Sequence, residues 1–511
     1  MSVTAGRPPS IQGDATAASR SLDLLEIPVL GRFLKWRYSR LTLQVPLFLL
    51  SVLMVVHAFA GPQLAPKNLA TLLTWVHFRG MVVLVLLLGG NLFCMACPFM
   101  LPREIARRFV TPRWTWPRWL RNKWLSLALF IAVLFVYEWL DLWANPSGTG
   151  MLIVGYFAVA LLVDCLFQRA SFCKYVCPVG QFNFISSTMS PVEITVRDQD
   201  LCSHCETKDC IRGSRHALLS PPAPAAVSPS DTSAVSPLPI VQRGCELALF
   251  QPRKVDNWDC TFCLDCIYAC PHDNVGIVTR LPASALPHSE SRSGIGKLNR
   301  RLDFTALIVV FTFGSLLNAF AMISPIYVVE QSIAESLGLR MEWPILVGLF
   351  GIALVIEPAV LLGAAAWLTR RFSGSEQSLL SIVKRFAVTL IPLGFGVWLA
   401  HYGFHFFTGC WTVIPVAQSA ARDFTGMSLL GSPKWELGGL PEEIVGVLET
   451  FFLSLGLLGS LLVTWQVSRQ FAPRHTVRVS GPWFALLVML FATACWVMSQ
   501  PMDMRGTFLG G

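Results

Sequence analysis

Long apolar runs separated by polar stretches dominate this chain. Crossing the hydrocarbon core of a membrane takes about 20 mostly apolar residues in a helix. Backbone polar groups in lipid need internal partners, so a helix is the form that such a run can take. The pattern therefore predicts an all-α polytopic membrane protein with about nine transmembrane helices, at about 41–60, 70–92, 124–142, 150–168, 303–324, 344–368, 385–407, 446–466 and 482–499.

Polar residues gather ahead of the first run and between the fourth and fifth runs. We therefore divide the chain into an N-terminal segment (1–40), four helices (41–168), a polar segment (169–302), and five helices with a short tail (303–511). Within the polar segment, residues 220–239 hold six Pro, five Ser and four Ala, a composition typical of a linker that buries no core. The rest of 169–302 has room for a small folded unit.

Composition and charge give this arrangement an orientation. Hydrophobic residues make up 53% of the chain and charged residues 14%, against about 25% charged in soluble domains, which excludes an ordinary soluble enzyme. If the N-terminus is cytoplasmic, 34 of the 40 Lys and Arg residues fall in inner segments and five in outer ones. Because basic loops stay inside, we expect a lipid-embedded protein of the bacterial inner membrane with residues 169–302 cytoplasmic and the C-terminus outside. The basic residues are spread over five loops, which argues against a nucleic-acid partner.

A cysteine run in the polar segment is the most specific motif. Cys260, Cys263, Cys266 and Cys270 follow the spacing C-x2-C-x2-C-x3-C-P of bacterial ferredoxins, in which three thiolates of one loop hold a four-iron cluster. Zinc sites use two well-separated pairs, and disulfides are rare in the cytoplasm. The run therefore predicts iron–sulfur chemistry.

A second, altered run precedes it. Cys202, Cys205 and Cys210, together with Cys245 beyond the linker, bring the number of thiols to eight, which is the number that two [4Fe-4S] clusters require. In two-cluster ferredoxins the last cysteine of a run binds the other cluster. We therefore assign cluster 1 to Cys202, Cys205, Cys210 and Cys270, and cluster 2 to Cys260, Cys263, Cys266 and Cys245. His204 is interpreted as a spacer.

Two cysteine pairs lie at inner helix ends, and each is followed by proline. They are Cys94 and Cys97 before Pro98, and Cys173 and Cys177 before Pro178. A free cysteine often packs as a small hydrophobe, but close pairs also favour dithiol chemistry. The pairs are interpreted as redox thiols, ligands of a further metal centre, or a docking platform for the ferredoxin segment, with a structural role as the alternative. The isolated Cys165, Cys410 and Cys495 are expected to be packing residues.

These motifs resemble those of membrane-bound polyferredoxins of the NapH-like and NosR-like type. The similarity covers about residues 77–278 and includes the stretches 90–98, 172–183 and 271–274. It implies electron transfer between the quinone pool or a soluble donor and a partner redox enzyme on the cytoplasmic side. The first pair is one residue shorter than the C-x3-C-P of that type, and no flavin-binding domain is expected ahead of the helices. The last five helices match nothing in that pattern.

Ionisable residues inside the spans are a further set of candidates, because such residues are rare and usually functional. His401 and His405 are four residues apart and so share one helix face. A quinone site is one interpretation, a b-type haem is a less favoured one, and polar packing within the bundle is the structural alternative. The candidates are His57, His77, Arg79, Glu138, Asp141, Glu357, His401 and His405.

The leading hypothesis is an electron-transfer component that passes single electrons through two [4Fe-4S] clusters. No nucleophile or base for bond-breaking chemistry is evident, so a stand-alone enzyme is the less favoured class. The alternative is a redox sensor or a maturation factor that uses the clusters and the Cys-Pro thiols. A third hypothesis is a transporter with a regulatory ferredoxin insert, which depends on the five unmatched helices.

Overall fold

All nine apolar runs are helical in the computed structural model, which describes residues 22–214, 241–288 and 292–502. Among these residues, eight helical stretches are long and apolar enough to cross a membrane, so the chain is an all-α polytopic membrane protein. The stretches are Ser39–Ala60, Leu69–Gly89, Pro146–Leu166, Leu302–Phe320, Trp343–Ser373, Leu379–Gly409, Glu442–Phe471 and Pro473–Met498. The ninth run forms a shorter helix, Trp124–Trp139, of 16 residues.

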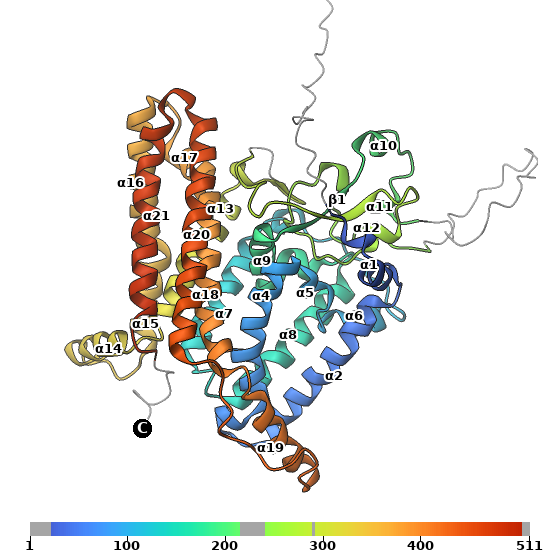
Figure 1. The fold of residues 1–511 in the computed structure, drawn as a ribbon, viewed down its shortest axis with the longest axis vertical. Helices are drawn as coiled ribbons and strands as arrows, with labels where there is room; N and C mark the ends of the chain where they lie inside the picture. The colour runs from blue at the N-terminus through green and yellow to red at the C-terminus, as the bar shows by residue number, and fades with distance from the viewer. Residues whose placement is uncertain (1–21, 215–240, 289–291, 503–511) are drawn as a thin grey trace, which may run out of the picture.

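The helices form two sets that lie side by side (Figure 1). The first set contains α2 (Ser39–Ala60), α4 (Arg79–Gly89), α7 (Trp124–Trp139) and α8 (Pro146–Leu166). The second contains α13 (Leu302–Phe320), α15 (Trp343–Gly351), α16 (Glu357–Ser373), α17 (Leu379–Phe386), α18 (Ile391–Gly409), α20 (Glu442–Phe471) and α21 (Thr476–Met498). Helix α18 joins the two sets, because it packs on α4 as well as on α13 and α20.

Small residues let α18 and α20 approach closely. A Cβ placed on Gly396 would come 2.9 Å from the carbonyl oxygen of Phe452 and 3.2 Å from the Cα of Gly456. The backbone N–H of Leu393 donates a hydrogen bond of 2.9 Å to the hydroxyl of Ser460. Such contacts between small residues are the usual basis of helix association in membranes, where apolar burial alone favours no partner.

The short helix α7 begins at the lobe and ends beside the span that leads into α4. At its start Lys123 contacts Asp259 of the cysteine-rich lobe. Beyond its end, Leu142 accepts a hydrogen bond of 3.0 Å from the indole of Trp75, which lies on the span that leads into α4. Helix α4 ends at the lobe. Gly90, which follows it, lies so close to Phe262 that a Cβ at this position would be 2.9 Å from the ring. Helices α4 and α7 therefore run in opposite directions.

The cysteine-rich lobe lies at one end of the bundle, and α14 (Ser324–Leu337) and α19 (Val413–Thr425) lie at the other (Figure 1). Strands β1 (Val192–Val196) and β2 (Val275–Thr279) pair antiparallel, with Ile194 opposite Ile277. This pairing brings together the two ends of the segment that holds the ferredoxin-type cysteines. Short helices α10 (Gln199–Ser203), α11 (Asp209–Arg212) and α12 (Asp265–Tyr268) complete the lobe. The linker predicted at 220–239 falls outside the described residues.

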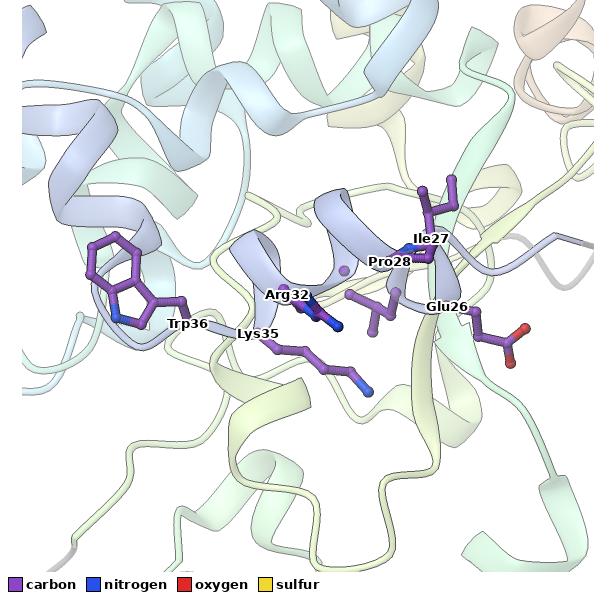
Figure 2. Close-up of a pocket in the computed structure, with 8 residues that line it drawn as sticks. Glu26, Ile27, Pro28, Arg32, Lys35 and Trp36 are labelled. Atoms are coloured by element: carbon purple, nitrogen blue, oxygen red, sulfur yellow. The ribbon is translucent and has the colours of Figure 1, made fainter.

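Helix α1 (Pro28–Lys35) binds along this lobe. The hydroxyl of Tyr268 donates a hydrogen bond of 2.6 Å to the carbonyl of Leu34. Figure 2 shows a surface hollow beside α1, in which Arg32 and Lys35 lie near each other and Glu26 lies toward the other end. Neither cysteine nor histidine lines this hollow. The hollow therefore offers no thiolate or imidazole ligand for a metal centre.

A buried ion pair joins the lobe to the bundle. The ammonium of Lys123 lies 2.5 Å from a carboxylate oxygen of Asp259, and both side chains are fully buried. The same ammonium donates to the carbonyl of Lys174 at 2.9 Å, and the backbone N–H of Lys123 donates to Asp303 at 2.9 Å. One residue thus connects α7, the second Cys-Pro loop, the Cys260 run and the start of α13.

The Lys123→Met variant is expected to lose about 3–5 kcal/mol of unfolding free energy, because it leaves the Asp259 carboxylate buried without its partner. Chemical denaturation in detergent micelles, followed by tryptophan fluorescence, measures this loss. The matched control is Lys35→Met, whose partner Asp273 lies 3.5 Å away at the surface, where an ion pair contributes less than about 1 kcal/mol. Equal effects of the two substitutions would contradict the assigned role of Lys123.

Candidate metal centres

The first group of thiols surrounds a small cavity in the lobe. Its four cysteines come from two distant runs, and Phe250, Pro252 and Val275 close the cavity on its apolar side. Burial and three neighbouring thiols raise the pKa of Cys210 to about 12, the neighbours being Cys270, Cys202 and Cys205. The structure therefore brings together the four residues that the sequence assigned to cluster 1.

The second group lies deeper, where the lobe meets the bundle. Cys245, Cys260 and Cys266 are buried and Cys263 is half-buried. Burial, and then the thiols of Cys245 and Cys260, raise the pKa of Cys266 well above its usual range. Burial also raises the pKa of Cys263, to which Cys245 and Cys266 contribute further. These are the four residues that the sequence assigned to cluster 2.

The two groups share a backbone contact. The N–H of Cys245 donates a hydrogen bond of 2.8 Å to the carbonyl of Cys210. This contact holds Cys245 next to the first run although the linker separates the two in sequence. The groups are thus adjacent, as two clusters in one small ferredoxin-type unit require.

Backbone conformation explains how the Cys260 run can curve so tightly. Asp259, Phe262 and Leu264 have φ values of 59°, 52° and 63°, in the left-handed region. Each costs conformational energy for a residue with a side chain, and such costs are typical of functional loops. Lys208, just before Cys210, has φ 52°. Both runs therefore contain strained backbone positions next to the cysteines that they contribute to the two groups.

Several sulfur atoms accept hydrogen bonds that spacing alone did not predict. The side-chain amide of Asn274 donates to Cys202 Sγ at 3.2 Å, and its backbone N–H donates to Cys270 Sγ at 3.3 Å. The N–H of Leu249 donates to Cys245 Sγ at 3.4 Å. Hydrogen bonds to ligand sulfurs tune the potential of an iron–sulfur cluster. In the sequence, only the position of Asn274, four residues after the last cysteine of the run, could have indicated that it donates to sulfur.

The two Cys-Pro pairs form a third group. Burial raises the pKa of Cys94, Cys97 and Cys173, and the nearby thiol of Cys177 raises it further in all three. Cys173 Sγ also lies 3.4 Å from Met100 Sδ, three residues after Cys97, so the two pairs meet at the ends of the spans that contain α4 and α8. Asn183, a further residue that spacing did not identify, donates to Cys94 Sγ at 3.2 Å.

The chemistry of these thiol groups suits iron–sulfur clusters better than single ions. No three His, Cys, Asp or Glu side chains in the described parts of the chain are placed to hold one metal ion together. In a four-iron cluster each thiolate binds a different iron, so the four sulfurs surround a larger centre. Where the pKa is raised, as for Cys210, Cys245 and Cys266, the thiol stays protonated unless a bound metal favours the thiolate form. The residues therefore fit [4Fe-4S] clusters, each held by four thiolates.

The histidine candidates divide into two kinds. His57 accepts a hydrogen bond of 3.1 Å from the N–H of Leu69 and lies 3.6 Å from Asp423. The first of these contacts ties α2 to the start of the next span. His77 lies 3.4 Å and 3.3 Å from the backbone carbonyls of Leu72 and Cys410. Both contacts are within the range of hydrogen bonds to backbone groups. His57 Nε2 has no hydrogen-bond partner, and the His77 ring lies 6.0 Å from that of Phe406 on α18, so a contact at one ring nitrogen or both is what distinguishes these two from His401.

His401 and His405 lie in the middle of the bundle. Their rings are 5.0 Å apart. Neither ring nitrogen of His401 has a hydrogen-bond partner, and His405 Nε2 also lacks one. Arg79 lies nearby, with its guanidinium 4.1 Å from the ring centre of Tyr137 and 5.0 Å from that of Tyr402. Buried polar atoms without partners require an explanation, and a polar ligand in this region would provide one.

Comparisons with known proteins give one partial match. No family model matches the chain, and no solved structure matches it. The chain is similar to the ferredoxin-type protein NapH of Escherichia coli strain K12, with 25% identity over 216 residues that make up 40% of this chain and 67% of NapH. This protein is therefore a multi-pass membrane protein that resembles, over part of its length, a ferredoxin-type protein.

Proposed function

We propose that this protein is a membrane-bound electron-transfer component that relays single electrons between the quinone pool or a soluble donor and a partner redox enzyme on the cytoplasmic side. The observation that carries the proposal is the pairing of eight thiols into two adjacent groups of four, in which Cys270 belongs to the group of the other run. That exchange is a property of two-cluster ferredoxins. The similarity to NapH supports the same class.

The chain's residues would hold two [4Fe-4S] clusters, which supply reversible one-electron chemistry when bound. Cys260, Cys263, Cys266 and Cys245 would hold the inner cluster beside the bundle. Cys202, Cys205, Cys210 and Cys270 would hold the outer one, where Cys202 and Cys205 are half-buried. An inner group against the membrane and an outer group near solvent suit a relay between a membrane donor or acceptor and a protein in the cytoplasm.

On the membrane side, we propose that His401, His405 and Arg79 form the contact with a quinone. A quinone carries two carbonyl oxygens that accept hydrogen bonds, and a quinol must lose protons when it gives up electrons. The unpartnered nitrogens of His401 and His405 can donate or accept such protons. The arginine, enclosed by Trp75, Tyr137 and Tyr402, would stabilise negative charge on the ring oxygens.

Replacing one cysteine from each ferredoxin-type group tests the cluster assignment. We expect Cys205→Ser and Cys263→Ser each to lose about four irons per chain after anaerobic purification, because each removes a ligand of a different four-iron cluster. Iron and sulfide analysis, with EPR of the dithionite-reduced protein, measures the loss. The control is Cys165→Ser, an isolated cysteine on α8. Unchanged iron in both variants would refute the two-cluster relay.

The Asn274→Ala variant tests the hydrogen bonds to sulfur. Removing the side-chain donor to Cys202 Sγ destabilises the more negative reduced state, so the midpoint potential of one cluster is expected to fall. A hydrogen bond of about 1 kcal/mol corresponds to roughly 40 mV for a one-electron couple. EPR-monitored redox titration measures this shift, and the iron content should not change. A rise in potential would contradict the assigned role of Asn274.

The His401→Leu variant tests the quinone contact. We expect reduction of the protein by a water-soluble quinol analogue to slow by more than about tenfold, because proton acceptance at this position is lost. Reduction by dithionite, which reaches the lobe from solvent, serves as the internal control and should keep its rate. Stopped-flow absorbance measures both rates. If quinol reduces neither parent nor variant, the chain is a redox sensor or a maturation factor, or its donor is soluble.

A further inference from the structure

We propose that Cys94, Cys97, Cys173 and Cys177 together hold a third iron–sulfur cluster, located between the membrane helices and the ferredoxin-type lobe. The role of this cluster rests on the proposed relay, whereas its existence does not. Sequence left the two Cys-Pro pairs open to several interpretations. In the fold the two pairs meet, and this observation favours the interpretation in which all four thiols form one metal site.

The two pairs present their sulfurs in the same way. Cys177 caps α9 (Pro178–Ser186), and its sulfur accepts a hydrogen bond of 3.0 Å from the N–H of Gly180. At the first pair, the backbone amides of Phe99 and Met100 lie within hydrogen-bonding reach of the Cys97 sulfur. In each pair the proline follows the second cysteine, so the chain turns and the next backbone amides point back at that sulfur. Pro178 is the first residue of α9, a position that suits a residue without an N–H, whereas Pro98 lies in a turn before α6.

Side chains from neighbouring elements add donors to the same sulfurs. The hydroxyl of Tyr156, on α8, lies 2.7 Å from Cys177 Sγ. The amide of Asn183, on α9, donates to Cys94 Sγ at 3.2 Å. Donors aimed at several sulfurs of one group are typical of thiolates that bind a metal centre, whose negative charge they stabilise. Four free thiols that only packed against each other would need no such set of donors.

A buried cation, itself paired with carboxylates, lies next to the group. Arg103, on α6 (Met100–Ala106), is 1% exposed and interacts electrostatically with Cys97 and Cys173. Its guanidinium is held by Glu246 at 2.7 Å and by Asp164 at 3.3 Å. A cluster with four thiolates carries net negative charge, and a charge in a buried site has to be paired. Arg103 would share its positive charge between such a cluster and the three carboxylates of Glu104, Glu246 and Asp164.

The site lies directly against the second ferredoxin-type group. The amide of Asn91, three residues before Cys94, donates to the carbonyl of Cys260 at 2.7 Å. Lys174, which follows Cys173, donates to the carbonyl of Leu247 at 2.5 Å, two residues from Cys245. A centre here would accept one electron from the membrane side and pass one on to the inner cluster, or the reverse, with no bond formed or broken.

The double variant Cys94→Ser/Cys173→Ser removes one thiol from each pair. We expect iron and sulfide to fall by about four atoms each per chain, from about twelve to about eight, while the EPR signals assigned to the two ferredoxin-type groups remain. The matched control is Cys165→Ser/Cys495→Ser, which removes two isolated thiols. Cys263→Ser should lose its own four irons in addition, so the two losses are separable.

Three outcomes would overturn the proposal. They are unchanged iron in the double variant, loss of one zinc or copper per chain in place of iron, and alkylation of all four thiols without loss of metal. If Cys263→Ser still loses iron in those cases, the proposed relay stands and only the third cluster fails. Should the double variant not fold, Tyr156→Phe provides a second test. It keeps all four thiols, so its iron content should equal the parent's, and the potential of one cluster should fall because a donor to Cys177 is gone. An unchanged set of potentials would count against the site.

Discussion

The buried contact between Lys123 and Asp259 is the interaction on which the arrangement of this protein depends. It joins a helix of the bundle to the residue that precedes Cys260, at 2.5 Å and without exposure to solvent. The pair stabilises the folded state only while both charges are present, because either one alone would be buried without a partner. The pair therefore fixes the register between bundle and lobe, and with it the position of every thiol in the Cys260 run.

Other buried charges follow the same principle around the Cys-Pro loops. Arg103, Asp164, Glu246 and Arg107 form a connected set in which each charge has an opposite neighbour. Arg40, at the start of α2, pairs with Asp265 at 3.2 Å, next to Cys266. In addition to apolar packing such as that of Trp258 on Phe304, the lobe is thus attached to the helices by charge pairs and hydrogen bonds. Such contacts are directional, so they hold redox groups at fixed separations better than apolar packing would.

The thiol groups form a sequence from the membrane outward. The Cys-Pro group lies at the ends of the spans, the Cys260 group is buried behind it, and the Cys202 group is partly open to solvent. Within the bundle, the histidines of α18 are a further buried polar group, His401 being 0% and His405 9% exposed. The five later helices thereby acquire a part in the proposed relay, since α18 carries His401 and His405 and packs against α4.

The sequence by itself determined the nine helical runs and the division of eight cysteines into two groups, because spans and cluster runs are encoded by local spacing. Only the tertiary structure decided that the two Cys-Pro pairs meet, that His57 and His77 have backbone partners while His401 has none, and that Asn274, Asn183 and Tyr156 reach sulfur. These facts depend on contacts between segments far apart in the chain. No periodicity or spacing within one segment reports which other segment will pack against it, and for that reason they could not be predicted.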